Sequence, residues 1–157
     1  MPILEKIVKS EDAKHWADSI PLEFHYTAGV AGEEFLRELK DNGRLLASKC
    51  PKCKNSYVPA RMYCATCFVE TKDRHNITSQ GLVYSFAVVD RDRSGNKLRK
   101  PAVVALVKFE GVKGGIVHLL NVDSSKEAAI GMKVSLVLKD RSERVGSLSD
   151  ILGFRPT

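Results

Sequence analysis

The sequence predicts an α+β protein in three parts: an N-terminal helical hairpin in residues 1–43, a small four-cysteine segment in residues 44–70 and a C-terminal all-β barrel in residues 71–157. Three observations support this division. Apolar residues recur at helical spacing before residue 43, all four cysteines fall between residues 50 and 67, and short β-branched runs fill the rest. A chain of 157 residues is long enough for one ordinary domain or two small ones.

The helical hairpin is expected to begin in "SEDAKHWADSI", where four apolar residues form one stripe at positions i, i+3, i+4 and i+7. Ser10 is a suitable N-cap, because its hydroxyl can accept a bond from a free backbone N–H, and Pro21 ends the helix. The stripe consists of Ala13, Trp16, Ala17 and Ile20.

A second helix is expected from near Thr27 to Asn42, because Gly43 suits the left-handed position that follows a helix end. Helices this short are only marginally stable alone, so they need a surface to lie on, either the rest of the chain or a partner. The apolar face of this helix is expected to consist of Phe35, Leu36 and Leu39. Glu33 and Arg37, one turn apart, are expected to form an ion pair.

All four cysteines occur in "KCPKCKNSYVPARMYCATC", as the Cys-x-x-Cys pairs Cys50/Cys53 and Cys64/Cys67 with ten residues between them. Each pair can form a tight turn that directs two thiolates at one point. Two such turns supply the four soft ligands that Zn²⁺ prefers, at a Zn–S distance of roughly 2.3 Å. The short spacer favours a rubredoxin-like zinc ribbon. Because a four-thiolate site leaves no position for water or substrate, the metal is expected to be structural.

Three other roles for the cysteines fit the sequence less well than zinc. Structural disulfides are disfavoured because nothing in the sequence indicates secretion. A thioredoxin-type redox motif needs one Cys-x-x-Cys at a helix start in a βαβ unit, which the surrounding pattern does not show. An iron centre of rubredoxin type stays open as the alternative. Such iron sites usually carry glycine after each pair, where this chain has Lys54 and Phe68.

The C-terminal part is predicted to form short strands separated by turns such as "DRSGNK" and "GVKGG". Before the fourth strand, Ser124 or Ser125 can cap a single helical turn. Four or five strands with one helical turn before a late strand fit a closed barrel of the OB-fold type, and a sandwich is the competing architecture. The five expected strands are "GLVYSFAVV", "PAVVALVKF", "GIVHLL", "KVSLVL" and "ILGFRP".

The net charge of +6 is unevenly distributed along the chain. Residues 1–43 carry a net charge of −4, residues 44–100 of +8 and residues 101–157 of +2. The basic middle indicates an anionic partner, either nucleic acid, a phosphorylated small molecule or an acidic protein face, although a solvated basic surface explains it equally well. No apolar run is long enough to span a bilayer and no signal-peptide pattern is present, so a cytoplasmic protein is expected.

The sequence shows no arrangement typical of catalysis. The histidines His15, His25, His75 and His118 are scattered, and all cysteines are assigned to the metal. Neither a nucleophile elbow nor a phosphate-binding glycine motif is present. We therefore expect a protein without catalytic residues.

A single-stranded nucleic-acid-binding ribbon/OB protein is one functional hypothesis. Tyr84 and Phe86 are two residues apart on one expected strand, so they can form a stacking platform beside a basic loop. However, the strand is a nearly continuous apolar run, which buries both rings as readily as it exposes them, and only 7% of the chain is aromatic.

A second hypothesis comes from a resemblance that covers nearly the whole chain. The motif "C-x-x-C…V-P-x-R-x-x-C-x-x-C", the "IGMKV" turn and the terminal "FRP" resemble the archaeal and bacterial family that joins a rubredoxin-like zinc ribbon to an acyl-CoA-associated OB fold. Lys54 and Ala65 depart from the family's usual glycine and proline, and neither departure removes a ligand.

The resemblance implies a non-catalytic accessory subunit of thiolase-type enzymes that binds acyl-CoA. Archaeal members look like the bridge between acetoacetyl-CoA thiolase and hydroxymethylglutaryl-CoA synthase, early in the mevalonate pathway. A purely structural adaptor is a third possibility. Arg61 is the first candidate for a CoA-binding side chain, although it fits a structural role in the ribbon equally well. The next candidates, which a solvated loop also explains, are Arg91, Arg93, Lys97, Arg99 and Lys100.

Overall fold

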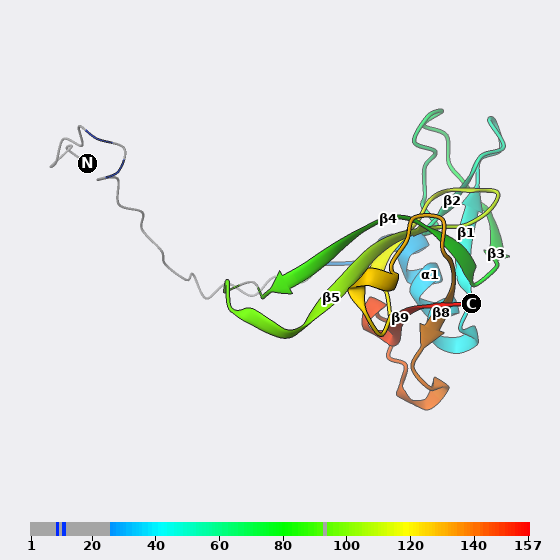
Figure 1. Cartoon of the computed structure of the whole chain (residues 1–157). Helices are drawn as coiled ribbons and strands as arrows, with labels where there is room; N and C mark the ends of the chain where they lie inside the picture. The colour runs from blue at the N-terminus through cyan, green and yellow to red at the C-terminus, as the bar shows by residue number, and fades with distance from the viewer. Residues whose placement is uncertain (1–8, 10, 12–25, 93) are drawn as a thin grey trace, which may run out of the picture.

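A computed structural model describes residues 9, 11, 26–92 and 94–157, arranged as Figure 1 shows. The first expected helix, at residues 13–20, and its expected cap Ser10 lie outside the described residues. No helix within the described ranges is long and apolar enough to cross a membrane. The elements are α1 (Gly29–Asn42), β1 (Leu45–Lys49), β2 (Ser56–Val58), β3 (Asp73–Ile77), β4 (Gln80–Arg91), β5 (Lys97–Lys108), β6 (Val112–Gly114), β7 (Ile116–Leu119), η2 (Ser125–Glu127), β8 (Lys133–Leu138), η3 (Arg141–Glu143), η4 (Leu148–Asp150) and β9 (Ile151–Pro156).

Helix α1 is the second of the two expected helices, and its position is confirmed. Phe35 and Leu39 are buried, and Leu36 packs against the same core. At the N-terminal end, the Thr27 hydroxyl accepts a 3.1 Å hydrogen bond from the backbone N–H two residues later. At the C-terminal end, Gly43 has a left-handed φ of 65°, and its N–H donates to the Leu39 carbonyl at 3.1 Å.

The four-cysteine segment is built on a small sheet with the strand order β3-β1-β2-β6. Strand β1 is antiparallel to β2 and to β3, and β2 runs parallel to β6. We call β1, β2 and the two cysteine turns the ribbon. Backbone hydrogen bonds join the ribbon to strands on its C-terminal side, and the boundaries expected at residues 43/44 and 70/71 stay a prediction.

The five expected C-terminal strands form a second sheet with the order β7-β5-β4-β8-β9. This sheet closes on itself because Leu120 and Phe154 form a parallel bridge, and the Asn121 N–H donates to the Phe154 carbonyl at 2.7 Å. The helical turn η2, capped by the Ser124 hydroxyl, precedes β8 as expected. A closed five-stranded barrel with this order is the OB arrangement, so the predicted α+β fold class is confirmed.

The main hydrophobic core joins helix α1 to the barrel. Phe35 and Leu39 of the helix belong to one cluster with Leu45 of β1, Val107 of β5 and Phe154 of β9, all almost completely buried. Burying each side chain of this kind contributes about 2 kcal/mol. Helix α1 is too short to be stable alone. Its packing on the barrel core provides the surface that the sequence analysis expected it to need.

Tyr84 and Phe86 do not share a face of β4, so that expectation was wrong. Val83 pairs with Val107, and the next paired residue of β4 is Ser85. Tyr84 is the extra residue of a β-bulge, which reverses the alternation of side chains at this point. The Tyr84 side chain is 57% exposed, whereas Phe86 packs against the core. The expected stacking platform is therefore not formed.

Candidate metal centre and neighbouring cavities

The four cysteine sulfurs converge at one end of the ribbon. All four Sγ atoms lie within 4.8 Å of one another, and those of Cys53 and Cys64 are 3.7 Å apart. All four are free thiols; Cys50 and Cys64 are buried, and Cys53 and Cys67 are half-buried. Four converging thiol sulfurs are the donor set of a tetrahedral structural zinc site, so these residues fit the ion.

Two turns with the same hydrogen-bond pattern position the sulfurs. In the first, the Cys50 N–H donates to the Asn55 carbonyl at 2.9 Å, the Lys54 N–H donates to the Cys50 carbonyl at 3.0 Å, and the Cys53 N–H lies 3.4 Å from Cys50 Sγ. The second turn repeats these bonds at 2.9, 3.0 and 3.4 Å, with Cys64, Val69, Phe68 and Cys67 in the matching positions.

Lys54 and Phe68 have left-handed φ values of 60° and 56°. They directly follow the second cysteine of each pair, where glycine is the easier residue. For a residue with a Cβ, this conformation costs about 1 kcal/mol or more. The turn forms nevertheless, so the missing glycines do not prevent the sulfurs from converging.

When no metal is bound, the surroundings of the cysteines give their thiols different pKa values. The Tyr57 hydroxyl lies 3.3 Å from Cys64 Sγ, and this hydrogen bond lowers the pKa of Cys64 to about 6. Burial raises the pKa of Cys67 to about 12. At neutral pH, one sulfur is already a thiolate, whereas another ionises readily only with a cation beside it. Because thiolates are the form that binds a metal, binding at this site would release the proton that Cys67 holds.

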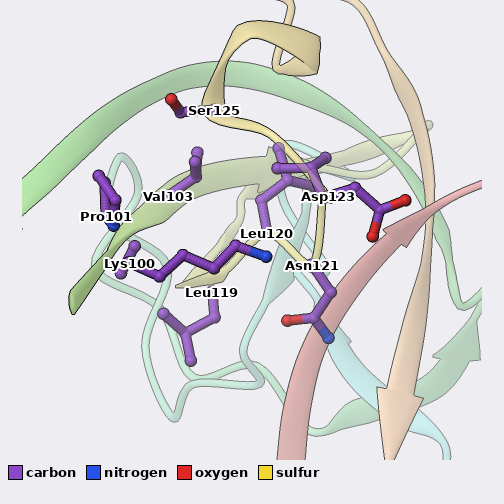
Figure 2. Close-up of a pocket in the computed structure, with 10 residues that line it drawn as sticks. Lys100, Pro101, Val103, Leu119, Leu120, Asn121, Asp123 and Ser125 are labelled. Atoms are coloured by element: carbon purple, nitrogen blue, oxygen red, sulfur yellow. The ribbon is translucent and has the colours of Figure 1, made fainter.

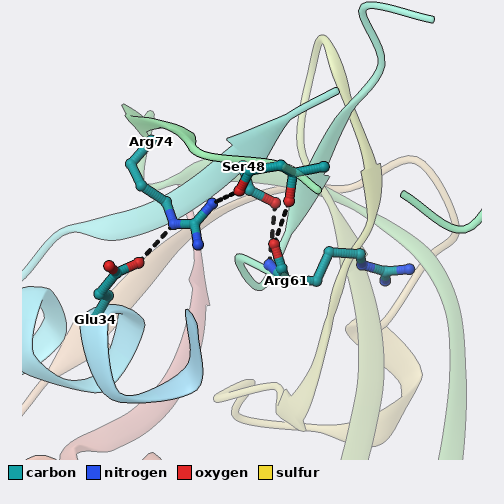
Figure 3. Close-up of polar contacts among 5 residues, drawn as sticks. Glu34, Ser48, Arg61 and Arg74 are labelled. Atoms are coloured by element: carbon teal, nitrogen blue, oxygen red, sulfur yellow. Dashed lines mark hydrogen bonds and ion pairs between the residues drawn. The ribbon is translucent and has the colours of Figure 1, made fainter. Parts of the chain in front are cut away.

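A chain of polar contacts connects the residues on either side of the second cysteine turn to helix α1 (Figure 3). The Arg61 N–H donates to Ser48 Oγ at 3.0 Å, and the Thr71 hydroxyl donates to the Arg61 carbonyl. The Thr71 carbonyl accepts from Arg74 Nη1, and Arg74 Nε donates to Glu34 Oε2 at 2.6 Å. Ser48 and Thr71 are fully buried, so these bonds satisfy polar groups away from water.

Arg61 lies beside the cysteine cluster, as its "VPAR" turn indicated. Its backbone takes part in the contacts of Figure 3, and its guanidinium carbon lies 4.6 Å from the centre of the Tyr57 ring. Tyr57, which the sequence did not single out, therefore connects Arg61 to Cys64. Among the residues that the structure describes, none forms a hydrogen bond or an ion pair with the guanidinium.

The described cations among the other candidates for binding CoA lie on a different part of the molecule, the β4–β5 hairpin that projects from the barrel (Figure 1). The structure therefore does not bring Arg61 together with them, and Arg93 lies outside the described residues. The exposed cations of the hairpin are Arg91, Lys97, Arg99 and Lys100.

Two cavities flank the root of this hairpin. The smaller, of about 440 Å³, follows β5, and Figure 2 shows the Lys100 side chain lying across it towards Asn121 and Asp123. The larger, of about 880 Å³, follows β4 on the other edge. Its lining includes the apolar side chains Leu82, Tyr84, Phe109 and Ile130 and the cations Lys108 and Lys133.

The larger cavity, which we call the β4 groove, was not foreseen from the sequence. Lys108 Nζ lies 3.2 Å from the centre of the Tyr84 ring, so one wall carries both an apolar surface and a positive charge. Its residues come from β4, β5, the turn before β8 and the C-terminus, which only the closed barrel brings together.

Two family models match the chain. Residues 37–73 match the rubredoxin-like zinc ribbon domain of ChsH2, and residues 76–139 match its C-terminal OB-fold domain. This chain belongs to the ChsH2-type zinc-ribbon/OB-fold family. The family assignment agrees with the metal-type turns and the closed barrel, and it extends over most of the described chain.

Members of the family with related sequences are named DUF35 domain-containing scaffold proteins. One, from Methanocaldococcus jannaschii, is 28% identical over 66% of this chain and 73% of its own length. Another, from Methanothermobacter thermautotrophicus, is 29% identical over 76% of this chain and 92% of its own length.

Two solved structures of the family share the fold. A DUF35-family protein of unknown function from Sulfolobus solfataricus has a TM-score of 0.64 and 29% identity, covering 82% of this chain and 84% of that one. The structure named Ltp2-ChsH2(DUF35) aldolase has a TM-score of 0.56 and 27% identity, covering 79% and 93%.

Proposed function

We propose that this chain is a non-catalytic, acyl-CoA-associated scaffold subunit of a thiolase-type enzyme assembly. The observation that carries the proposal is the likeness to the Ltp2-ChsH2(DUF35) aldolase structure, which extends over 93% of the matching chain. The scaffold names of the two archaeal relatives support it. In this assembly, the chain helps acetoacetyl-CoA pass between thiolase and hydroxymethylglutaryl-CoA synthase, and the chemistry takes place in the partners.

The metal centre supports a scaffold role. We propose that Cys50, Cys53, Cys64 and Cys67 hold a zinc ion, whose chemistry here is to fix four thiolates in place. With four sulfur ligands, such an ion has no position for a substrate, so its effect is on folding. It stabilises a small segment that contacts helix α1 through Arg74 and Glu34.

The β4 groove is the proposed contact for the acyl-CoA. CoA carries a pyrophosphate and a 3′-phosphate on an extended arm, so its site needs cations beside an apolar wall. The groove offers Lys108 and Lys133 next to Leu82 and Tyr84. The cations expected from the sequence, Arg61 and those of the hairpin, stay candidates for the same phosphates; of these, Lys100 lines the smaller cavity.

Thermal shift measurements test the ligand. CoA and acetoacetyl-CoA are expected to raise the Tm of the zinc-loaded chain, and Lys133→Glu is expected to remove most of the rise. Lys113→Glu, an exposed substitution on β6 outside both cavities, is the matched control. Loss of the response in Lys100→Glu but not in Lys133→Glu would move the site to the smaller cavity.

A response to a single-stranded oligonucleotide alone, with a steep salt dependence, would replace this function by nucleic-acid binding. Purification of the tagged chain from its native cell tests the assembly. We expect a thiolase-type enzyme to be retained in stoichiometric amount. Recovery of the chain without any such enzyme would contradict the proposed function.

A further inference from the structure

The β4–β5 hairpin continues well beyond the barrel (Figure 1). Strand β8 pairs with β4 only at residues 80–82, and β7 pairs with β5 only at residues 104–107. We call residues 85–92 and 96–102 the arm. Among the described strands, these residues pair only across the hairpin, β4 with β5. Both outer edges of the arm therefore present unpaired backbone groups, which are templates for another chain.

The arm shows apolar side chains on both faces. Val88 lies opposite Val103, on the face that continues the core, and it is 47% exposed. Val89 lies opposite Ala102 on the other face and is 37% exposed. An exposed antiparallel sheet usually keeps one face polar, and a two-stranded ribbon is only marginally stable in water. These faces are therefore suited to burial against another molecule.

The described residues next to the tip of the arm, 91, 92 and 94–96, are joined by hydrogen bonds. Asp92 Oδ1 accepts from the backbone N–H groups of Ser94 and Asn96 at 2.8 and 2.9 Å, and Arg91 Nη1 donates to the Gly95 carbonyl at 3.0 Å. An arm with a formed tip loses less conformational entropy on binding than a flexible loop does.

The charge of the arm selects the kind of partner. Four cations of the arm are exposed, Arg91, Lys97, Arg99 and Lys100, against two acidic residues, of which Asp90 is exposed and Asp92 has its carboxylate occupied by the turn. A second copy of this chain would bring the same cations together, which disfavours self-association. Single-stranded nucleic acids are bound by exposed stacking rings beside cations, whereas the exposed large apolar side chains of the arm are Val88 and Val89. An acidic protein surface with an apolar groove satisfies both the cations and the valines.

We propose that the arm is the element that docks onto the enzyme partner, entering an apolar groove bordered by carboxylates. This inference rests on the proposed function and adds the surface through which the scaffold holds the enzyme. The two cavities at its root lie beside this interface, so a ligand in the β4 groove is placed next to the docked enzyme.

The test uses the thiolase-type enzyme that wild-type chain retains in its native cell, identified by mass spectrometry and then titrated against purified variants. The double variant Val88→Ser/Val89→Ser is expected to weaken binding at least tenfold. Val117→Ser, at a 63% exposed valine of β7 outside the arm, is the control and is expected to bind as wild type. Lys97→Glu is expected to slow association and flatten its salt dependence, with Lys113→Glu as its control.

The outcomes separate the two proposals. If wild type retains the enzyme and the arm variants bind it as tightly as wild type, the arm is not the docking element and the scaffold function stands. If wild type retains no such enzyme, the proposed scaffold function is contradicted, and so is the proposal that the arm docks onto that enzyme. If light scattering shows a wild-type dimer that dissociates in Val88→Ser/Val89→Ser, this outcome would overturn the proposal in favour of a second copy of the chain. Oligonucleotide binding that is lost in Lys97→Glu would overturn it in favour of a nucleic acid.

Discussion

Arg74 on β3 donates a 2.6 Å hydrogen bond from Nε to Glu34 Oε2 on helix α1, across 40 residues of sequence. The Arg74 side chain is 20% exposed, and its Nη1 also donates to the Thr71 carbonyl. One guanidinium therefore ties the segment that follows the second cysteine turn to the helix that lies on the barrel. This pair adds a polar link between the sheet of the ribbon and the helix, beside the apolar packing of Leu45 with Phe35 and Leu39.

Replacing Arg74 is expected to destabilise the zinc-loaded protein. Arg74→Met keeps the aliphatic stem but removes two charge-assisted hydrogen bonds, and it should lower the free energy of unfolding by about 2 kcal/mol. Arg37→Met removes an arginine whose ion pair with Glu33 is exposed, and it should change little. Urea unfolding of both variants measures the difference. Equal effects would show that the ion pair to helix α1 does not hold the ribbon.

Removing the Tyr57 hydroxyl is expected to weaken zinc binding without unfolding the protein. In Tyr57→Phe, the pKa of Cys64 should rise from about 6 towards that of an ordinary thiol. More protons must then be displaced by zinc near neutral pH, so affinity should fall about tenfold and depend more steeply on pH between 6 and 8. Chelator competition measures this, with Tyr63→Phe, an exposed tyrosine, as control. Unchanged affinity would mean that Tyr57 does not stabilise the thiolate.

Asp150 is expected to make stability depend on acidity. Burial alone would raise its pKa, but the N–H groups of Val145, Gly146 and Ser147, at 2.7 to 3.2 Å, more than offset this and lower it. A lowered folded-state pKa stabilises the fold above the unfolded value of about 4. This contribution is lost as pH falls through the folded-state pKa.

The substitution Asp150→Asn tests this contribution. It should cost about 2 kcal/mol at pH 7, with a deficit that shrinks below about pH 4. Urea unfolding at several pH values measures the difference in free energy of unfolding between the variant and wild type. Because both proteins release zinc in acid, that effect cancels in the difference. Asp140→Asn, at an exposed position, is the control. A deficit independent of pH would show that the Asp150 charge is not what stabilises the loop.

The closure of the barrel depends on a glycine in β9. Gly153 has φ 140°, and a Cβ there would lie 2.8 Å from the Leu119 carbonyl oxygen. Gly131 has φ 84°, but a Cβ there meets nothing within 4 Å. Both alanine variants strain the backbone, and only Gly153→Ala pushes β7 away from β9. We expect Gly153→Ala to cost about 2 kcal/mol more than Gly131→Ala in thermal unfolding. If both substitutions destabilise the protein equally, backbone strain alone explains their effect and the contact with Leu119 does not contribute.

The sequence identified the local elements because their signals are local. The stripe of Phe35, Leu36 and Leu39, the stop at Gly43 and the Glu33–Arg37 pair all lie within a few residues, and the structure has each of them. The Cys-x-x-Cys spacing likewise indicated a converging sulfur cluster, because two residues between cysteines suffice for a turn. The five β-branched runs all form strands.

Where the outcome depended on pairing between distant segments, the sequence could not decide it. The bulge at Tyr84 exists only in the register of β4 with β5, so period-two alternation placed Tyr84 and Phe86 on one face wrongly. The partnership of Tyr57 with Cys64, and the β4 groove built from four segments, also arise only after closure. The sequence by itself determined helix α1, the five barrel strands, the metal-type turns and the family. Only the tertiary structure decided which side chains meet, and that an arm with two apolar faces is left uncovered, because strand register and barrel closure are set by long-range packing.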